Sequence, residues 1–250
     1  MTKNSTYFVS DMHFGTDVFG SSVEREKRFV RWIESVRGNM KALYLLGDVF
    51  DFWFEYRHAV PQGFTRFLGK IAELSDEGVE VHYFTGNHDI WIYRYLPHEL
   101  GVILHREPLT TNIDGKIFYL AHGDGLGDNN LSFRFIRGLF HNRACRYFFS
   151  LIHPSFGIWL ALKWANHSRR KEFEHPAPYL GEEREPLVMY AKDYIRRYPE
   201  IDYLIFGHRH IMLDLMLNRR SRMMIIGDWL KYFSYAVFDG EKLALEEVIR

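Results

Sequence analysis

Seven side chains of the kind that bind divalent metal ions lie in five short motifs along this 250-residue chain. The motifs are D-x-H, G-D, G-N-H-D, H-G-D and G-H-x-H, and they contain Asp11, His13, Asp48, Asn87, His122, His208 and His210. Carboxylate, amide and imidazole ligands together suit Mn, Fe, Zn or Co better than Ca. One carboxylate can bridge two such ions about 3.5 to 4 Å apart. The motifs therefore predict a two-metal hydrolase site, whose excess positive charge would attract phosphate.

Each motif follows or ends a short apolar run, which is the pattern of a buried strand. The runs span residues 7–9, 42–46, 81–84, 117–120 and 203–206. Residues two apart in an extended segment point the same way, so the D-x-H and H-x-H motifs can each offer two ligands. If these strands lie side by side, we expect their ends to bring all seven ligands to one edge of a sheet.

Helical patterns lie between the predicted strands. Apolar residues at helical spacing predict amphipathic helices over residues 23–36, 64–74 and 187–198. Towards the C-terminus, residues 223–226, 235–238 and 243–248 predict strands, and the turn Asp239-Gly240 joins the last two as a hairpin. This order predicts a mixed α/β sandwich formed by one large domain.

The composition narrows the functional class. Lys plus Arg and Asp plus Glu both total 32, so the net charge gives no general attraction to nucleic acid. The single Cys145 cannot form an internal disulfide, which fits a reducing cytoplasm. No signal peptide and no apolar run as long as a spanning helix is visible. We therefore expect a cytoplasmic protein, at most peripheral to a membrane.

Residues 131–171 depart from the alternation of strands and helices. The segment contains no acidic residue, and its Arg and Lys residues are interspersed with many aromatic and aliphatic residues. Its spacing is helical with breaks at Pro154 and Gly157, and it lies between His122 and His208, so we expect an insertion at the mouth of the site. Two interpretations stay open: a cap with an apolar core-facing side and a solvated basic side, or a lid that accommodates lipid and touches an anionic membrane surface.

The five motifs resemble those of the calcineurin-like metallophosphoesterases, in the same order and over essentially the whole chain. The resemblance implies a four-layer α-β-β-α sandwich, with one domain over residues 1–250 and a helical cap insertion at about 126–180. It also implies that the two ions have four ligands each and one carboxylate in common. The sets are Asp11, His13, Asp48 and His210 for one ion, and Asp48, Asn87, His122 and His208 for the other.

Within this superfamily the chain looks most like the UDP-2,3-diacylglucosamine hydrolases of lipid A biosynthesis. The segments that support this are DMHFG at residues 11–15, LGDVFDFWF at 46–54 and HGDGLGD at 122–128. The resemblance implies hydrolysis of the pyrophosphate bond of a nucleotide-activated glycolipid, giving UMP and 2,3-diacylglucosamine 1-phosphate, with two divalent ions and Mn as the expected metal. The insertion lies where that family carries its lipid-binding cap, so we also expect contact with the cytoplasmic face of the inner membrane.

Other functions are weighed against this one. The main alternative is a metallophosphoesterase with another substrate: a nucleotide pyrophosphatase, a phosphodiesterase or a phosphoprotein phosphatase. A nuclease would need a basic groove for several phosphates, and the zero net charge counts against it. A non-catalytic scaffold would have lost ligands, whereas all seven are present.

His88 departs from the better-known members of the resembled family, which carry Arg at this position. By the resemblance to the wider superfamily, His88 is expected to stabilise or protonate the leaving group, oriented by Asp89 as the second catalytic residue. Substrate contacts are expected from six residues: Asn87, His88, Asn130, Asn166, Arg169 and His208.

Further acidic residues are expected around the ligands. Metal-bound imidazoles usually donate their other N–H to a carboxylate or carbonyl, and Asp51, Asp89 and Asp124 are the candidates. For Trp53, Phe54, Asp228 and Trp229, packing in the core or at the rim is the expected role.

Overall fold

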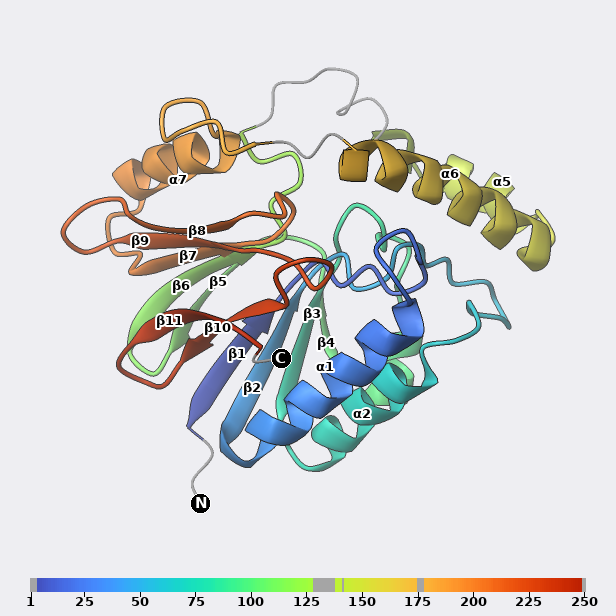
Figure 1. Cartoon of the computed structure of the whole chain (residues 1–250), viewed down its shortest axis with the longest axis horizontal. Helices are drawn as coiled ribbons and strands as arrows, with labels where there is room; N and C mark the ends of the chain where they lie inside the picture. The colour runs from blue at the N-terminus through green and yellow to red at the C-terminus, as the bar shows by residue number, and fades with distance from the viewer. Residues whose placement is uncertain (1–3, 128–137, 141, 175–177, 249–250) are drawn as a thin grey trace.

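Two mixed β-sheets, one of six strands and one of five, form the centre of the protein. The computed structural model describes residues 4–127, 138–140, 142–174 and 178–248, without the side chains of Trp164 and of residues 166–174. Helices cover the outer faces of both sheets, so that the layers run helix, sheet, sheet, helix (Figure 1). The predicted α-β-β-α sandwich is confirmed.

The strands of the first sheet are β1 Ser5–Val9, β2 Met40–Leu46, β3 Glu80–Phe84, β4 Ile103–His105, β10 Ser234–Phe238 and β11 Leu243–Glu247. They lie in the order β11-β10-β1-β2-β3-β4, with β1 to β4 parallel, β10 antiparallel to β1, and β11 antiparallel to β10. The second sheet contains β5 Leu109–Ile113, β6 Lys116–Ala121, β7 Tyr203–Phe206, β8 Met212–Met216 and β9 Arg222–Ile226. Its order is β5-β6-β7-β9-β8, and its parallel pairs are β6–β7 and β7–β9.

Helices α1 Ser22–Val36, α2 Thr65–Asp76 and α3 Tyr95–Leu100, with the short 3₁₀ helix η1 Arg37–Asn39, lie on the side of the first sheet. Helix α7 Pro186–Arg197 covers the second sheet. Local sequence explains where two of them begin. The Ser21 side chain accepts a hydrogen bond from the Glu24 N–H at the start of α1, and α7 begins with a proline, which suits a first helical position.

Three apolar layers hold these elements together. Phe8 of β1 and Phe118 of β6 stack with ring centroids 5.7 Å apart between the sheets. Phe29 of α1 is buried beside the first sheet, and Leu187 and Val188 of α7 are buried against the second. Full burial of each such side chain contributes about 1.5–3 kcal/mol. The layers thereby fix both sheets at their carboxyl ends, where the motifs lie.

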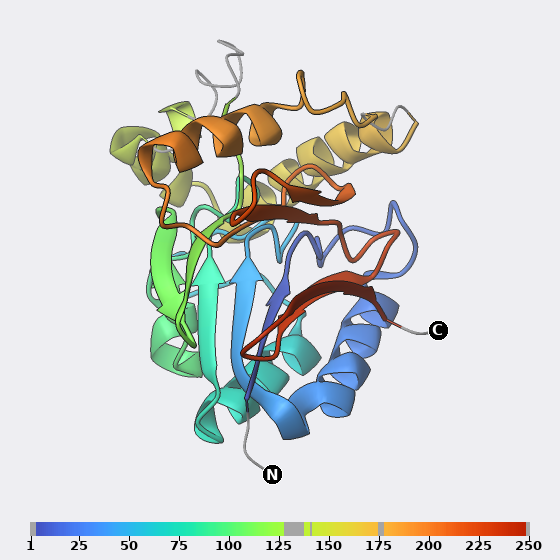
Figure 2. The same ribbon diagram turned by 90° about the vertical axis from the view of Figure 1, so that its left-hand side faces the viewer.

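Helices α5 Arg143–Ser150 and α6 Pro154–Glu174 form the cap, above the strand ends (Figure 2). They fall within the predicted insertion at 126–180, whose bounds stay a prediction, as does the single domain over residues 1–250. The expected break at Gly157 is wrong, because α6 runs through this residue. A Cβ atom there would lie 2.5 Å from Tyr56 Oη and 3.4 Å from Phe149 Cζ. The glycine thus allows close packing of α6 on the domain.

The predicted strands, helices and C-terminal hairpin are confirmed, but the expectation of a single sheet edge is wrong. β6 and β7 belong to the second sheet, so two edges face each other. An apolar run shows that a strand is buried, and it does not show which strand pairs with it. The short elements α3, β4, β5 and β8 were not predicted. Among the helices that the structure describes, none has both the length and the apolar character needed to cross a bilayer.

Candidate metal centre

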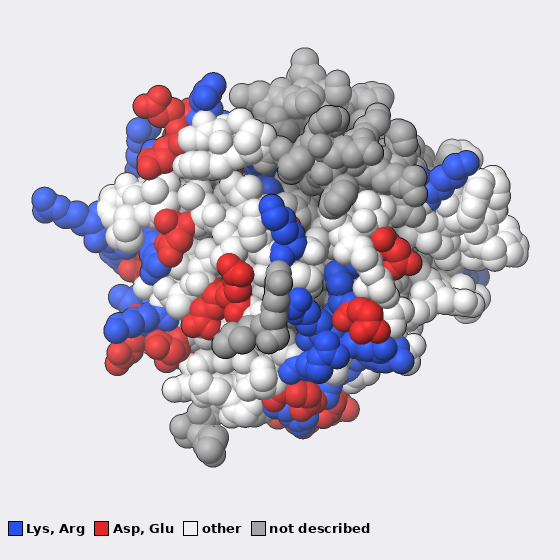
Figure 3. All heavy atoms as spheres, viewed as in Figure 1, with Lys and Arg blue, Asp and Glu red and all other residues white. Residues whose placement is uncertain are grey.

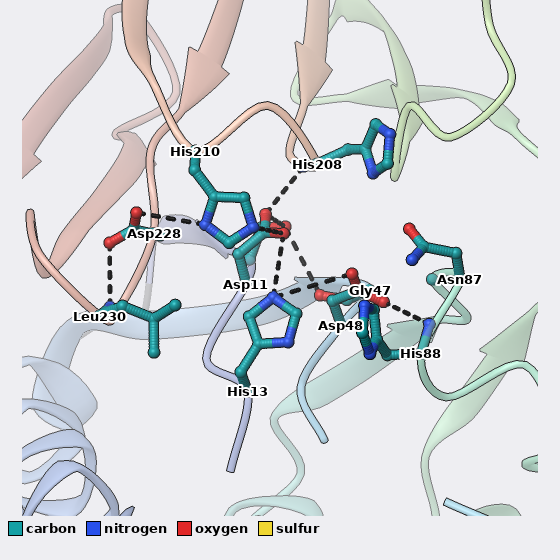
Figure 4. A network of polar contacts seen from close by, with 12 residues as sticks. Asp11, His13, Gly47, Asp48, Asn87, His88, His208, His210, Asp228 and Leu230 are labelled. Carbon is teal, nitrogen blue, oxygen red and sulfur yellow. Dashed lines mark hydrogen bonds and ion pairs between the residues drawn. The ribbon is translucent and has the colours of Figure 1, made fainter. Parts of the chain in front are cut away.

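The structure brings all seven predicted ligands together where strands of both sheets end. Figure 4 labels each of them except His122. The first sheet supplies Asp11 and His13 after β1, Asp48 after β2 and Asn87 after β3. The second sheet supplies His122 after β6, and His208 and His210 after β7. These side chains form two neighbouring groups that share the region around Asp48.

The first group contains Asp11, His13 and His210, whose ligand atoms lie within 4.8 Å of one another. Asp11 Oδ1 is 3.6 Å from His13 Nε2 and 3.4 Å from His210 Nε2. This oxygen is buried and accepts no hydrogen bond from the described part of the chain. A buried carboxylate oxygen is costly without a partner, and a divalent cation between these three atoms would satisfy it.

The second group contains Asp48, His122 and His208, again within 4.8 Å of one another. His122 Nε2 lies 3.3 Å from Asp48 Oδ2 and 3.3 Å from the amide oxygen of Asn87. Asp48 Oδ2 is also 3.8 Å from His13 Nε2 in the first group. The Asp48 carboxylate therefore lies between the two groups, close to a ring nitrogen of each.

Three of the imidazoles are held through their outer nitrogen. His122 Nδ1 donates to the Leu46 carbonyl at 2.8 Å, His13 Nδ1 lies 3.2 Å from Asp51 Oδ1, and His210 Nδ1 lies 3.2 Å from Asp228 Oδ2. In each ring this arrangement leaves Nε2 as the nitrogen that faces the carboxylates of the centre. Metal-binding histidines are usually oriented in this way, so the rings are positioned to act as ligands.

The backbone at the centre lies in a region that side-chain-bearing residues rarely adopt. Eight described residues other than glycine have a positive φ, and five of them are predicted ligands: Asp11, His13, Asp48, His208 and His210, with φ between 45° and 66°. Such conformations cost about 1–3 kcal/mol each and occur mainly at functional sites. The rest of the fold therefore compensates for this conformational free energy, and the strained backbone directs these side chains towards one another.

Two glycines of the motifs are required by close approach. A Cβ at Gly86 would collide with the Asp48 carboxylate and backbone, and a Cβ at Gly207 would collide with Ser10 Oγ and Asp11 Oδ2. Ser10 Oγ itself donates to Asp11 Oδ2 at 2.5 Å. The glycines thus make room for the carboxylates of neighbouring strands.

The electrostatics favour ionised carboxylates at the centre. Burial raises the pKa of Asp48, but the positive charges of His122 and His88 outweigh it and hold that pKa well below its usual range. The pKa of Asp11 is lowered in the same way, because His210 and His13 outweigh burial. Burial, followed by the charge on His122, lowers the pKa of His208 to about 4, so this imidazole is uncharged at neutral pH. Two carboxylates and neutral imidazole attract a divalent cation.

Asp89 connects the loops that carry the ligands. Its carboxylate accepts hydrogen bonds from the N–H groups of Val49 at 2.9 Å and Gly86 at 2.7 Å, and from Tyr83 Oη at 2.6 Å. Burial, with the nearby Asp48 carboxylate, raises its pKa to about 6. These contacts give Asp89 the role of positioning the loops after β2 and β3.

His88 lies beside the first group, with its ring centroid 5.0 Å from that of His13. Its Nδ1 donates to the Asp51 carbonyl at 2.9 Å, and its backbone N–H donates to Asp48 Oδ1 at 2.8 Å. The ring is therefore oriented by the Asp51 carbonyl, whereas the sequence predicted that Asp89 would orient it. The catalytic roles of His88 and Asp89 stay predictions.

Asp228 contributes to the centre, and the prediction of a packing role for it is wrong. Besides His210, its carboxylate holds the following turn through the N–H groups of Leu230 at 2.9 Å and Lys231 at 2.6 Å. A sequence signal was present: Gly227-Asp228 follows β9 just as Gly47-Asp48 follows β2. Two other acidic residues were predicted to orient the imidazoles. Asp51 contacts His13, whereas Asp124 raises the pKa of His122 through its charge, after larger effects of Asp48 and Asp11.

The predicted substrate residues are only partly described. Asn87 and His208 lie in the second group and His88 beside the first. Asn130 lies outside the described residues. Asn166 and Arg169 belong to α6, and their side chains lie outside the description. Substrate contacts by these three residues stay predictions.

The cap is attached to the domain close to the metal centre. Phe149 of α5 packs on Phe54 with ring centroids 4.7 Å apart and on Trp91 at 5.2 Å. Trp91 Nε1 donates to the Phe140 carbonyl at 2.9 Å. Other large apolar side chains of the cap are exposed: Leu139, Tyr147, Phe148, Leu151, Phe156, Trp159 and Leu160. One apolar side of the cap therefore packs on the domain and another faces solvent.

Comparisons with known proteins agree with this geometry. A family model described as calcineurin-like phosphoesterase matches residues 5–212. A UDP-2,3-diacylglucosamine hydrolase from Porphyromonas gingivalis is 42% identical over 257 positions, which cover 98% of each chain. Proteins of the same name from Aeromonas salmonicida and Neisseria gonorrhoeae are 25% and 27% identical, over 97% and 94% of this chain and 93% and 95% of theirs.

Proposed function

This chain belongs to the calcineurin-like phosphoesterase family, and we propose that it hydrolyses the pyrophosphate bond of UDP-2,3-diacylglucosamine in lipid A biosynthesis. The products would be UMP and 2,3-diacylglucosamine 1-phosphate. The observation that carries the proposal is the 42% identity to a UDP-2,3-diacylglucosamine hydrolase over 98% of both chains. The convergence of all seven ligands and the exposed apolar side of the cap are what this chemistry requires.

We further propose that the centre holds two divalent metal ions, with Mn as the physiological metal. Asp11, His13, Asp48 and His210 would hold one ion, and Asp48, Asn87, His122 and His208 the other. The unsatisfied Asp11 oxygen and the central position of Asp48 support this assignment. The oxygen and nitrogen donors also suit Mn, which binds carboxylate and imidazole.

The ligand residues would hold divalent ions, and metal binding would supply a nucleophile by lowering the pKa of a water molecule. Asp48 fixes the distance between the two groups, because its Oδ2 faces both His13 and His122 while its Oδ1 is held by the His88 N–H. Asp89 keeps the loops after β2 and β3 in register. The preorganisation of these groups reduces the reorganisation needed to reach the transition state.

His88 would act on the leaving phosphate. Since Nδ1 donates to the Asp51 carbonyl, a hydrogen bond to substrate must come from Nε2, which carries a proton only in the imidazolium form. An imidazolium here would stabilise the developing charge through one donor. An Arg guanidinium at this position would donate two parallel hydrogen bonds to a phosphate. With His88, stabilisation of the leaving phosphate depends on a single hydrogen bond.

The cap would hold the acyl chains and rest on an anionic membrane surface. Phe148 of α5 is 65% exposed, Leu151 just after α5 is 64% exposed, and Trp159 of α6 is 54% exposed. Arg143 and Arg146 lie on the same helix as Phe148, beside a groove of about 1090 Å³. In the coloured part of this end of the molecule, uncharged surface lies beside Lys and Arg side chains (Figure 3). Apolar residues next to basic residues suit the boundary between acyl chains and acidic head groups at the cytoplasmic face of the inner membrane.

The test is a product assay. With Mn present, the protein should release UMP from UDP-2,3-diacylglucosamine, and the same protein treated with a chelator should not. A water-soluble dinucleoside diphosphate serves as the comparison substrate. Full activity toward the soluble compound with none toward the acylated one would reject the lipid assignment in favour of a nucleotide pyrophosphatase.

A further inference from the structure

A cavity of about 220 Å³ opens directly beside the metal centre. Its lining includes Gly86, His122 and Asp124, and Tyr119 and Tyr190 also contribute to the wall. No described residue of α5 or α6 lines it. α7, which carries Tyr190, and the cap helices lie on opposite sides of the strand ends in Figure 1. The described wall of the cavity therefore comes from the domain and α7, and not from the cap helices.

The wall of the cavity contains aromatic rings and polar atoms, beside the charged residues Arg106, Glu107 and Asp124. Tyr119 Oη and Tyr190 Oη are 2.7 Å apart, in a hydrogen bond that either hydroxyl can donate. The His105 ring stacks on Phe84 with centroids 4.6 Å apart, and its Nε2 is 2.9 Å from His82 Nδ1. Burial, with the nearby His82, lowers the pKa of His105 to about 4, so the ring is uncharged at neutral pH. Such a wall suits a flat, neutral heterocycle that carries hydrogen-bonding groups.

The shape of the proposed substrate requires a second binding site beside the metal centre. The proposed substrate has two unlike halves joined by the pyrophosphate that must lie at the metal ions. Its acyl chains require apolar area, which the exposed side of the cap provides. The nucleoside half must then leave the phosphates in another direction, and the cavity begins at the ligand His122.

We propose that this cavity binds the pyrimidine nucleoside of the substrate, with the ribose near His122 and the base against His105 and the Tyr119–Tyr190 pair. The assignment rests on the proposed function and adds the site that selects the nucleotide. Pockets that hold drug-sized ligands measure about 300–1,000 Å³. A cavity of about 220 Å³ is smaller, which favours a one-ring base over a purine.

Inhibition by the product UMP tests the assignment, because UMP carries the nucleoside without the lipid. Leu126, half-buried in the cavity wall, can be replaced by the larger Trp (Leu126→Trp) to fill the space, and Tyr190→Phe removes one hydroxyl. We expect the inhibition constant of UMP to rise tenfold or more in Leu126→Trp and about threefold in Tyr190→Phe. In the unsubstituted protein, AMP should inhibit at least tenfold more weakly than UMP.

Tyr194→Phe is the matched control. Tyr194 is also on α7 and lies 4.3 Å from Tyr119 between ring centroids, but it does not line the cavity, so UMP inhibition should not change. Each variant is also assayed with bis-p-nitrophenyl phosphate, which has no nucleoside. The ratio of kcat/KM for the natural substrate to kcat/KM for this compound should fall in Leu126→Trp.

Different results would overturn the proposed function and the assignment of the cavity. If the unsubstituted protein releases no UMP from UDP-2,3-diacylglucosamine, the proposed function is wrong, and the nucleoside site with it. If it does release UMP, yet Leu126→Trp and Tyr190→Phe are inhibited by UMP like the unsubstituted protein, only the assignment of the cavity is overturned.

Discussion

The metal centre and the cap differ in how their side chains are held. Asp11 and Asp48 are 0% and 2% exposed, and the imidazoles around them are fixed through their outer nitrogens. In the cap, Phe148 and Leu151 are 65% and 64% exposed. Chemistry at phosphorus needs ligands held within about 0.5 Å, whereas acyl chains need apolar area without fixed geometry. Changes at the centre should therefore affect every substrate, and changes in the cap only substrates with acyl chains.

The largest expected effect is at Asp48. Asp48→Asn removes the negative charge shared by both ligand groups, and we expect kcat/KM to fall by roughly 1,000-fold or more for the acylated substrate and for bis-p-nitrophenyl phosphate alike. Steady-state assays with both substrates measure this. Asp193→Asn, an exposed residue of α7 paired with Arg197, is the control and should leave both activities unchanged. If kcat/KM fell only for the acylated substrate, the prediction that changes at the centre affect every substrate would be wrong.

Asp228→Asn should have the second largest effect, a loss of metal affinity, because it weakens the contact that orients the His210 ring. Asn keeps an acceptor for the N–H groups of Leu230 and Lys231 but replaces the charged oxygen 3.2 Å from His210 Nδ1. Loss of such an orienting contact typically costs about 10–100-fold in metal affinity. A titration with Mn should therefore show half-maximal activity at a concentration higher by that factor, with activity restored at excess Mn. Equal losses at all Mn concentrations would argue against an orienting role.

In the cap, the double variant Phe148→Ser, Trp159→Ser should lose activity toward the acylated substrate only. Both side chains are more than half exposed, so folding should be unaffected, while the apolar area offered to acyl chains falls. We expect kcat/KM for UDP-2,3-diacylglucosamine to fall about tenfold or more, and that for bis-p-nitrophenyl phosphate to stay constant. Met216→Ser, which changes an equally exposed residue of β8, is the matched control. Parallel losses with both substrates would refute a lipid-specific role.

The smallest effect concerns the junction between the two regions. Gly157→Leu would force α6 away from Tyr56 and Phe149, and overpacking of this kind costs about 1–3 kcal/mol. A thermal melt should show Tm lower by several degrees. Gly69→Ala in α2 is the comparison, because a Cβ at Gly69 meets nothing within 4 Å and should raise Tm slightly. An unchanged Tm in Gly157→Leu would mean that α6 is not packed on the domain through this residue.

The sequence predicted which side chains come together better than it predicted their surroundings, for physical reasons. Asp48 and His122 follow continuous apolar strands, and this local pattern is enough to place them at strand ends. Strand pairing is not local, so the division of the strands between two sheets could not be derived from the apolar runs. The contact between Asp228 and His210 crosses from β9 to the segment after β7, and only the fold creates it. In the cap, periodicity marked the apolar residues but could not separate Phe149, which packs on the domain, from the exposed Phe148.

The division of the ligands between two sheets has a consequence for stability. Asp11 and His13 come from the first sheet and His210 from the second, and the other group likewise joins Asp48 and Asn87 to His122 and His208. Any ion held by either group is therefore a cross-link between the two halves of the sandwich. Because the unfolded chain lacks this arrangement, metal binding is linked to folding, and stability rises by RT ln(1 + [metal]/Kd). A divalent ion bound here would therefore also stabilise the fold, and chelation should weaken the sandwich as well as stop the reaction.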